Sequence, residues 1–328
     1  MTTILEPVDQ SSKNSIKRIV STFSWRQNLI YVGFAVIFVL FSITLNDRGF
    51  LTSDNLLNIV RQTSTISVMA VGVVFVIAAA QIDLSVGATA GLASVTTAMT
   101  INSVGLVPGI VAGLATGVIV GLLNGFFVSV VGVPSFLATL GMLGMAQGAA
   151  MWITGAAPQA INDLDFTFLF GDSNIGPIPG LLLWTLLIVL IGHFGLRRTG
   201  FGRQVLATGG NSKAAAFSGV HTKRVVFLVL LLSSVLAALA GMLYAGRFHT
   251  GSYNTGTGDE LSVIAAVILG GTSLFGGRAS VVGALLGSLM IGLLNNGLIL
   301  MGLDSAQQQV ARGAIIILAV AVTARRRV

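Results

Sequence analysis

The chain has 328 residues, of which 54% are hydrophobic and only 9% are charged. Soluble domains carry about 25% charged residues, so this composition excludes an ordinary soluble globular protein. The net charge of +7 would suit a nucleic-acid-binding protein, but the positions of the charges, described below, exclude that reading. The 41 glycines are typical of closely packed membrane helices. Because there is no cysteine, neither a disulfide framework nor a thiolate metal site is possible.

Apolar segments recur along the whole chain at the length that a membrane-spanning helix needs, which is about 20 residues. The pattern predicts an all-α polytopic membrane protein with about ten transmembrane helices. Residues 1–27 form a polar tail, and residues 28–328 form the transmembrane domain. The first apolar run is too long for a cleaved signal sequence, and no small-residue cleavage site follows it. The eighth span ends in Gly276-Gly277 and is expected to be a broken helix. The predicted spans lie near 28–45, 62–80, 84–102, 109–130, 136–153, 180–196, 225–245, 261–276, 280–300 and 309–324.

Charge asymmetry predicts the orientation, because cytoplasmic loops of membrane proteins are rich in Lys and Arg. Both termini and the basic segment 197–224 are expected to be cytoplasmic. The segment 154–179, which holds three Asp residues, is expected to lie on the outer side. The opposite orientation would place the basic segment and the Arg325–Arg327 tail outside, which is strongly disfavoured. The sequence therefore predicts a multi-pass membrane protein with both termini in the cytoplasm.

An internal repeat is visible in two pairs of motifs. Asp83–Val86 and Glu260–Val263 open the third and eighth spans, and Gly121–Asn124 and Gly292–Asn295 lie in the fourth and ninth. Both pairs are separated by five spans, so the two halves would be inverted relative to each other in the membrane. Inverted repeats are common in transporters, whose pathway lies between the halves.

Five polar residues interrupt the apolar segments and are candidates for a translocation pathway or gate: Gln81, Asp83, Asn124, Asn295 and Asn296. A carboxylate within the membrane is costly and usually has a function. Asp83 can cap the third span by accepting from its free amides, or it can act as a gate or an ion relay. The buried amides can hydrogen-bond neighbouring helices or line a polar pathway.

Glycine positions suggest packing and bending. Gly113, Gly117, Gly121 and Gly125 are four residues apart, so they share one helix face that suits either ordinary close packing or a gate helix. The stretch Gly270–Arg278 superficially resembles a phosphate-binding loop, but it lacks the lysine that such a loop requires. It therefore predicts a tight bend and no ATP site.

Metal and hydrolytic sites are disfavoured by the sequence. His193, His221 and His249 are dispersed, and no metal-binding spacing occurs. We expect no metal site, no catalytic residue and no nucleic-acid partner.

The segment 199–220 carries signals for a short helix on the basic side. Asn211 or Ser212 can form its N-cap, an alanine run follows, and Gly219 can end it. A helix of two turns is marginal alone and becomes stable by docking, and small alanine faces fit a groove on a partner protein, with Ala215 expected at the contact. The alternative is a solvated connector. The candidate docking residues are Gly209, Gly210, Asn211, Ser212, Lys213, Ala214, Ala215, Ala216, Ser218 and Gly219.

Four sequence segments carry a specific resemblance to a known family. Residues 81–87 read Gln-Ile-Asp-Leu-Ser-Val-Gly, residues 269–277 read Leu-Gly-Gly-Thr-Ser-Leu-Phe-Gly-Gly, and residues 292–298 read Gly-Leu-Leu-Asn-Asn-Gly-Leu. With the segment 200–220, they resemble permeases of the ribose/xylose/autoinducer-2 ABC importers, and the resemblance runs from about residue 54 to the end. Gln81 departs from the family, which usually has Gly there.

The resemblance implies the function and the partners. Such a permease works as a homodimer, docks two cytoplasmic ATPase domains, and receives a sugar, here one of the pentose kind, from a periplasmic binding protein. The segment 200–220 matches the family's coupling loop. ATP and magnesium would be bound by the ATPase, so no cofactor is expected in this chain. The alternatives are a proton-coupled carrier, for which Asp83 is the one candidate acid, an intramembrane enzyme, and a branched-chain amino-acid permease.

Overall fold

The computed structural model describes residues 25–304, 306–311, 313–314 and 317 of the chain. Most of the expected tail at 1–27 and of the tenth span at 309–324 lies outside these residues, as does the Arg325–Arg327 sequence. Within the described residues every long element is a helix, and each strand has two residues. The prediction of an all-α fold is confirmed.

The long helices follow one another along the chain, with the longest connection at residues 155–179. They are α2 (Trp25–Thr44), α3 (Ser53–Ala78), α4 (Val86–Val104), α5 (Leu106–Phe126), α6 (Ser135–Thr154), α8 (Gly180–Arg198), α9 (Gly200–Gly210), α11 (Thr222–Phe248), α12 (Asp259–Leu269) and α13 (Val281–Leu300). The shorter elements are the 3-10 helix η1 (Asn46–Arg48), the π-helices η2 (Phe127–Val131) and η3 (Phe168–Asp172), the helices α7 (Leu164–Thr167) and α10 (Ser212–Phe217), and the strands β1 (Gln159–Ala160), β2 (Asn174–Ile175), β3 (Ile178–Pro179) and β4 (Thr250–Gly251).

Nine of the predicted spans, from 28–45 to 280–300, coincide with helices. Among the described residues, six helices are long and apolar enough to cross a membrane, judged by length and composition: α3, α5 with η2, α6, α8, α11 and α13. The protein is therefore an all-α, multi-pass membrane protein.

The predicted eighth span is wrong in its second half. Helix α12 has 11 residues and ends at Leu269, so it is about 16 Å long and cannot cross a hydrocarbon layer of about 30 Å. The chain leaves the helix at Gly270 instead of at the expected Gly276-Gly277. Gly271, Gly276 and Gly277 all have left-handed backbone conformations with φ near +80°, which allow the expected bend.

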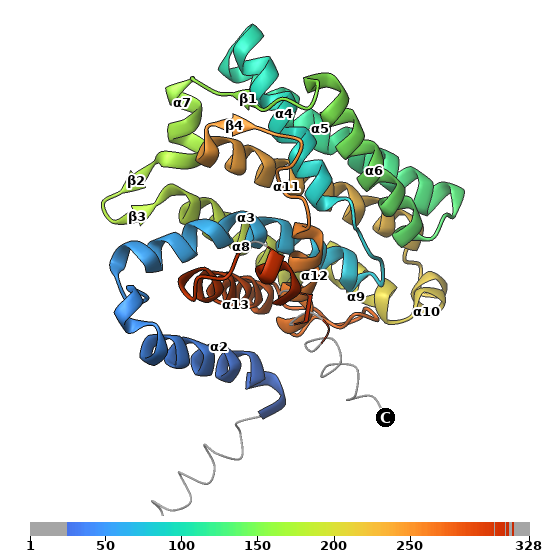
Figure 1. The fold of residues 1–328 in the computed structure, drawn as a ribbon. Helices are drawn as coiled ribbons and strands as arrows, with labels where there is room; N and C mark the ends of the chain where they lie inside the picture. Colours follow the sequence, from blue (N-terminus) through green and yellow to red (C-terminus); the bar gives the residue numbers. More distant parts are fainter. Residues whose placement is uncertain (1–24, 305, 312, 315–316, 318–328) are drawn as a thin grey trace, which may run out of the picture.

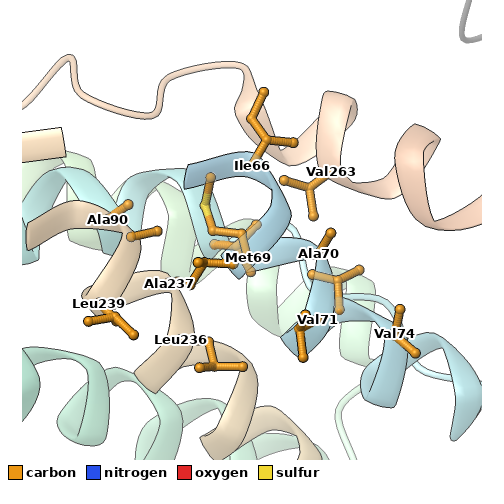
Figure 2. Close-up of a cluster of buried hydrophobic side chains, with 14 of the residues drawn as sticks. Ile66, Met69, Ala70, Val71, Val74, Ala90, Leu236, Ala237, Leu239 and Val263 are labelled. Atoms are coloured by element: carbon orange, nitrogen blue, oxygen red, sulfur yellow. The ribbon is translucent and has the colours of Figure 1, made fainter. Parts of the chain in front are cut away.

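Helices α3 and α11 form the centre of the fold (Figure 1). In their most apolar windows 83% and 67% of the residues are buried, whereas the same measure is 33% for α5, 22% for α6 and 33% for α8. The outer helices thus keep apolar faces free for lipid. Figure 2 shows Met69, Val71 and Val74 of α3 packed with Leu236 of α11 and Val263 of α12.

The glycine face of α5 is a packing surface, as one of its two interpretations predicts. Gly117 faces Ala238 and Gly121 faces Leu231, both on α11. A Cβ added at Gly121 would lie 2.7 Å from the Leu231 Cα, which is closer than real atoms approach. The absence of side chains on this face therefore sets the distance between α5 and the central helix.

Residues 250–258, a two-residue strand followed by a series of turns, pack along α4 and connect α11 to α12. Gly251 lies against Ser94, and Gly256 lies against Gly87, nearly two turns further towards the start of the helix. Strand β4 at the start of this segment pairs with β1 of the 154–179 loop, with Gln159 opposite Gly251. Non-helical backbone of this kind is tolerated beside membrane helices when protein covers it.

A glycine substitution tests the close approach of α5 and α11. In Gly117→Val the new Cβ would lie 2.6 Å from the Ala238 Cβ and 3.0 Å from the Val235 Cα. We expect a loss of about 1–3 kcal/mol in stability, measured as a lower thermal unfolding midpoint of the detergent-purified protein.

Gly144→Val on α6 is the matched control, because nothing lies within 4 Å of its added Cβ. Equal unfolding midpoints for the two variants would contradict the packing role of the α5 face.

Candidate functional site

The connection between α3 and α4, residues 79–85, is non-helical, and apart from the exposed Ala80 its residues are half-buried or buried. Two hydroxyls one turn apart on α6 hold it. The Ile82 amide donates to the Ser135 Oγ at 3.1 Å, and the Leu84 amide donates to the Thr139 Oγ1 at 3.0 Å. These side chains supply hydrogen-bond partners that the backbone lost when helix α3 ended. The break is thus a built feature of the fold.

Asp83 and Asn124 are joined through Ser85. Asp83 Oδ1 accepts from the Ser85 amide at 2.9 Å and from its hydroxyl at 2.6 Å, and Asn124 Nδ2 donates to the same hydroxyl oxygen at 2.9 Å. Asp83 is 0% exposed and Asn124 is 1% exposed. Asp83 accepts from Ser85, the N-cap residue of α4, and no side chain in the described part of the chain accepts from the first amides of the helix itself, so the choice between capping and a gate stays open.

Two oxygens of this network lack a hydrogen-bond partner within the described part of the chain: Asp83 Oδ2 and Asn124 Oδ1. A buried polar atom without a partner is costly, so these atoms are poised to accept from a group that enters or from a rearranged helix. The arrangement can therefore accept further hydrogen bonds at these two oxygens.

The other three candidate pathway residues lie elsewhere. Gln81 is close to Asp83 in the chain, but its Nε2 faces the Ala79 carbonyl at 3.4 Å. Asn296 exchanges two hydrogen bonds, of 3.1 and 2.8 Å, with Asn55 of α3, so it joins α13 to α3. Asn295, its neighbour, has a buried Oδ1 without a partner in the described chain. The structure therefore brings Asp83 and Asn124 together and separates them from the α13 pair.

Sequence reasoning missed the residues that build the break: Ser85, Ser135 and Thr139. Their signal was present, because Ser135 and Thr139 are four residues apart in an apolar span directly after Pro134. Hydroxyls at this spacing share a helix face, and they need partners in a membrane. Nothing in the sequence alone indicated that their partners lie on a segment 50 residues earlier.

The short helix predicted in segment 199–220 is confirmed as α10. Asn211 forms its N-cap, with Oδ1 accepting from the Ala214 amide at 3.0 Å. Gly219 ends it with φ +86°, and its amide donates to the Ala216 carbonyl while Val220 donates to that of Ala215. These are the cap-and-stop signals that the sequence predicts. Helix α9 precedes it directly and is itself capped by Thr199.

Two of the ten candidate docking residues face the protein itself. Gly209 is buried, and an added Cβ there would meet the Ala78 carbonyl of α3 and lie 2.9 Å from the Gly277 amide nitrogen. Ala215 is 6% exposed, so it anchors α10 to its own chain, and its expected place at a partner contact is wrong. The remaining eight are exposed: Gly210, Asn211, Ser212, Lys213, Ala214, Ala216, Ser218 and Gly219.

Phe217 is the residue that sequence reasoning missed on this element. Its side chain is 94% exposed at the end of α10, although phenylalanine is usually buried. It is the one large apolar residue in the segment 207–219, which was a signal available in the sequence. An exposed aromatic ring on a short, well-capped helix is typical of a docking contact.

Among the described residues no group of three or more His, Cys, Asp or Glu side chains could hold a metal ion.

The features that the structure does build are a polar break inside a helix bundle and a short helix displayed at one end. Figure 1 shows α10 at the end of the long helices opposite to β2 and β3. With the six long apolar helices, they define the class of the protein as a polytopic helical membrane protein that displays a short helix at one end.

Comparisons with known proteins identify the family. Residues 55–320 match the family described as "Branched-chain amino acid transport system / permease component". The chain is 40% identical to the probable ABC transporter permease protein YphD of Escherichia coli K12, covering 96% of this chain and 94% of that one. It is 36% identical to the ribose import permease protein RbsC of the same strain, covering 85% and 88%. It is 32% identical to the xylose transport system permease protein XylH, covering 95% and 98%. No solved structure matches the chain significantly.

The chain therefore belongs to this family of ABC importer permeases and is a multi-pass transport subunit of the inner membrane. The resemblance found in its sequence motifs is confirmed. As a transport subunit of such an importer, it is not itself a catalytic enzyme.

Substitutions of Asp83 separate capping from a need for charge. Asp83→Asn keeps an oxygen that accepts from Ser85, so we expect near-normal transport. Asp83→Leu leaves the Ser85 amide and hydroxyl without an acceptor, at a cost of about 1–3 kcal/mol. We expect a lower thermal unfolding midpoint and little transport for the Leu variant. Loss of transport in Asp83→Asn, at a normal protein level in the membrane, would instead favour a charge-dependent gate.

Proposed function

We propose that this chain is the translocation subunit of a sugar importer and that it moves a pentose-like sugar delivered by a periplasmic binding protein. Named relatives that act on ribose and xylose support the sugar over a branched-chain amino acid. ATP and magnesium are bound by a separate cytoplasmic ATPase, and this chain needs no cofactor. This chain provides the translocation pathway and the element that transmits motion from the ATPase to the helices, and it carries out no covalent chemistry.

The display of α10 carries this proposal. The helix is capped at both ends, is fixed to its own chain by Ala215, and presents Phe217 with 94% of its surface exposed. Ala214 and Ala216, on either side of the buried Ala215, are also exposed, and their small side chains project little from the helix. A ring flanked by small residues suits insertion into an apolar groove of the ATPase, with the segment 197–224 as the coupling loop.

Motion at α10 can reach the helix bundle through backbone contacts. Gly209, at the end of α9, lies against Ala78 at the end of α3. The Gly277 amide donates to the Ala78 carbonyl at 3.0 Å, and Gly276 lies against Gly209. Since these contacts involve almost no side chains, displacement of α9 would press directly on α3 and on the break that follows it.

The contacts of the helices support the inverted repeat and, with it, about ten spans. The repeat relates α3 to α11 and α5 to α13. Helix α5 packs on α11, and α13 packs on α3, so these two contacts are equivalent under the repeat. In both contacts a glycine faces the neighbouring helix: Gly117 faces Ala238, and Gly292 faces Thr63. The two repeated motifs also approach each other, because Gly87 lies against the Glu260 carboxylate.

The proposal includes the pathway, the orientation and a second copy. A path between the halves would pass the buried oxygens of Asp83 and Asn124, with Gln81, Asn295 and Asn296 as further candidates. The segment 197–224 and both termini face the cytoplasm, and the loop 154–179 faces the periplasm. The transmembrane domain 28–328 pairs with a second copy of itself in the assembled importer.

Phe217→Asp tests the coupling role. Removing an aromatic anchor from a contact costs about 2 kcal/mol or more, which corresponds to roughly thirtyfold weaker binding. We expect a folded, membrane-inserted permease that no longer co-purifies with its ATPase and no longer supports sugar uptake. Ala214→Glu and Ala216→Glu should act in the same direction.

Phe168→Asp is the matched control, because Phe168 is also exposed but belongs to the loop 154–179. It should still co-purify with the ATPase. If Phe217→Asp binds the ATPase as tightly as Phe168→Asp does, α10 is only a connector.

The proposed orientation can be tested with single cysteines, since the chain has none of its own. Lys213 and Asp165 are both exposed, on α10 and on α7 respectively. With an impermeant thiol reagent on intact spheroplasts, Asp165→Cys should react at once, and Lys213→Cys should react only after permeabilisation. The reverse pattern would overturn the orientation.

A further inference from the structure

A wide-open surface cavity of about 300 Å³ lies between the end of α5 and the start of α11. Its walls are Ser129 and Val130 of η2 and Lys223, Arg224 and Phe227 of α11. None of these residues belongs to the buried network of Asp83 or to the exposed surface of α10. Lys223 and Arg224 are the last two residues of the proposed coupling loop 197–224, but neither the exposed surface of α10 nor the buried network accounts for the cavity beside them.

The cavity arises from a change of helix type. At Phe127 the last turn of α5 widens from an α-helix to the π-helix η2, and Ser129 Oγ donates to the Gly125 carbonyl at 2.7 Å. The Phe227 ring packs on Gly125, where an added Cβ would lie 2.7 Å from its Cδ2. The Phe227 ring, seated against Gly125, forms an apolar wall of the cavity beside the wide turn. π-Helical turns of this kind are frequent at functional sites.

The rim of the cavity carries two positive charges that the protein does not neutralise. Lys223 and Arg224 are exposed and lie in the first turn of α11, where the helix dipole disfavours cations. Neither forms an ion pair within the described part of the chain. No Asp or Glu occurs in residues 84–162 or 173–258, which include every helix near the cavity. The positions therefore favour an anion from outside the chain.

The surroundings of the cavity indicate what kind of anion it is. Large apolar side chains are exposed next to it, on η2 and at the start of α6: Phe127, Val130, Val131, Phe136 and Leu137. Such a surface faces lipid tails, so Lys223 and Arg224 lie at the boundary between the apolar belt and the polar end of the protein. A ligand that suits both parts has a negative headgroup and an apolar tail.

We propose that this cavity binds the phosphate headgroup of an anionic phospholipid, such as phosphatidylglycerol, with its acyl chains along η2 and α6. Basic pockets between membrane helices are known to take such headgroups. The bound lipid would hold the base of α11, which begins three residues after Gly219 ends α10. The site depends on the protein's place in a membrane and not on its sugar or its ATPase.

The test uses the full-length permease, purified in a mild nonionic detergent and titrated with dioleoyl phosphatidylglycerol or dioleoyl phosphatidylcholine. Native mass spectrometry measures occupancy, and thermal unfolding measures stabilisation. Each Lys or Arg near an anionic headgroup contributes roughly fivefold in affinity, so Lys223→Gln/Arg224→Gln should lose roughly twenty-five-fold. Val130→Trp fills the cavity without changing its charge and should also weaken binding severalfold.

Arg197→Gln/Arg198→Gln is the control, because it removes the same charge from exposed residues in the last turn of α8 that do not line the cavity. It should stay within about twofold of the unmodified protein, and phosphatidylcholine should bind at least tenfold more weakly than phosphatidylglycerol.

Three results would overturn the proposal. The first is unchanged binding of phosphatidylglycerol in a folded Lys223→Gln/Arg224→Gln variant. The second is an equal loss in the control variant, which would mean diffuse attraction of charges. The third is a stabilisation by millimolar inorganic phosphate equal to that by the lipid, which would mean a site for free anions.

Discussion

The constraint on which the rest of this structure depends is that backbone groups inside a membrane protein need partners within the protein. The chain leaves the helical state at residues 79–85, between α3 and α4, and satisfies two amides there with Ser135 and Thr139 of α6. The break lets Asp83, Ser85 and Asn124 form one buried hydrogen-bonded group. Without the clamp from α6, neither the break nor the polar group beside it could be stable.

Glycine residues bring backbone segments of different elements into direct contact. Where a side chain is absent, helices and loops approach until their backbones touch, as Gly121 does at Leu231 and Gly209 does at Ala78. The first contact holds a peripheral helix against the central one. The second joins the element that we propose for ATPase docking to the end of α3. A contact between backbones transmits displacement with little loss, because no flexible side chain lies between the moving parts.

Acidic and basic residues are unevenly distributed along the chain. Acidic residues are missing from two long stretches that contain most of the membrane helices, and basic residues gather at the ends of α8 and α11 and between them. This asymmetry favours one orientation in the membrane. It also leaves Lys223 and Arg224 without an internal partner at the edge of the apolar surface, so one feature of the sequence bears on both topology and lipid contact.

The sequence by itself determined the fold class, the positions of nine helices, the caps of α10 and the family, because these depend on apolar length, local capping residues and local motifs. It could not decide which residues face one another. Ala215 and Phe217 are two positions apart on the same short helix, yet one is buried in its own chain and the other is exposed. Asn124 and Asn295 occupy matching places in a repeated motif, yet only Asn124 meets a serine. Likewise, α12 ends where Gly270 packs against the backbone of Gly283. Each of these outcomes depends on a neighbour distant in the chain, and only tertiary packing brings that neighbour into contact.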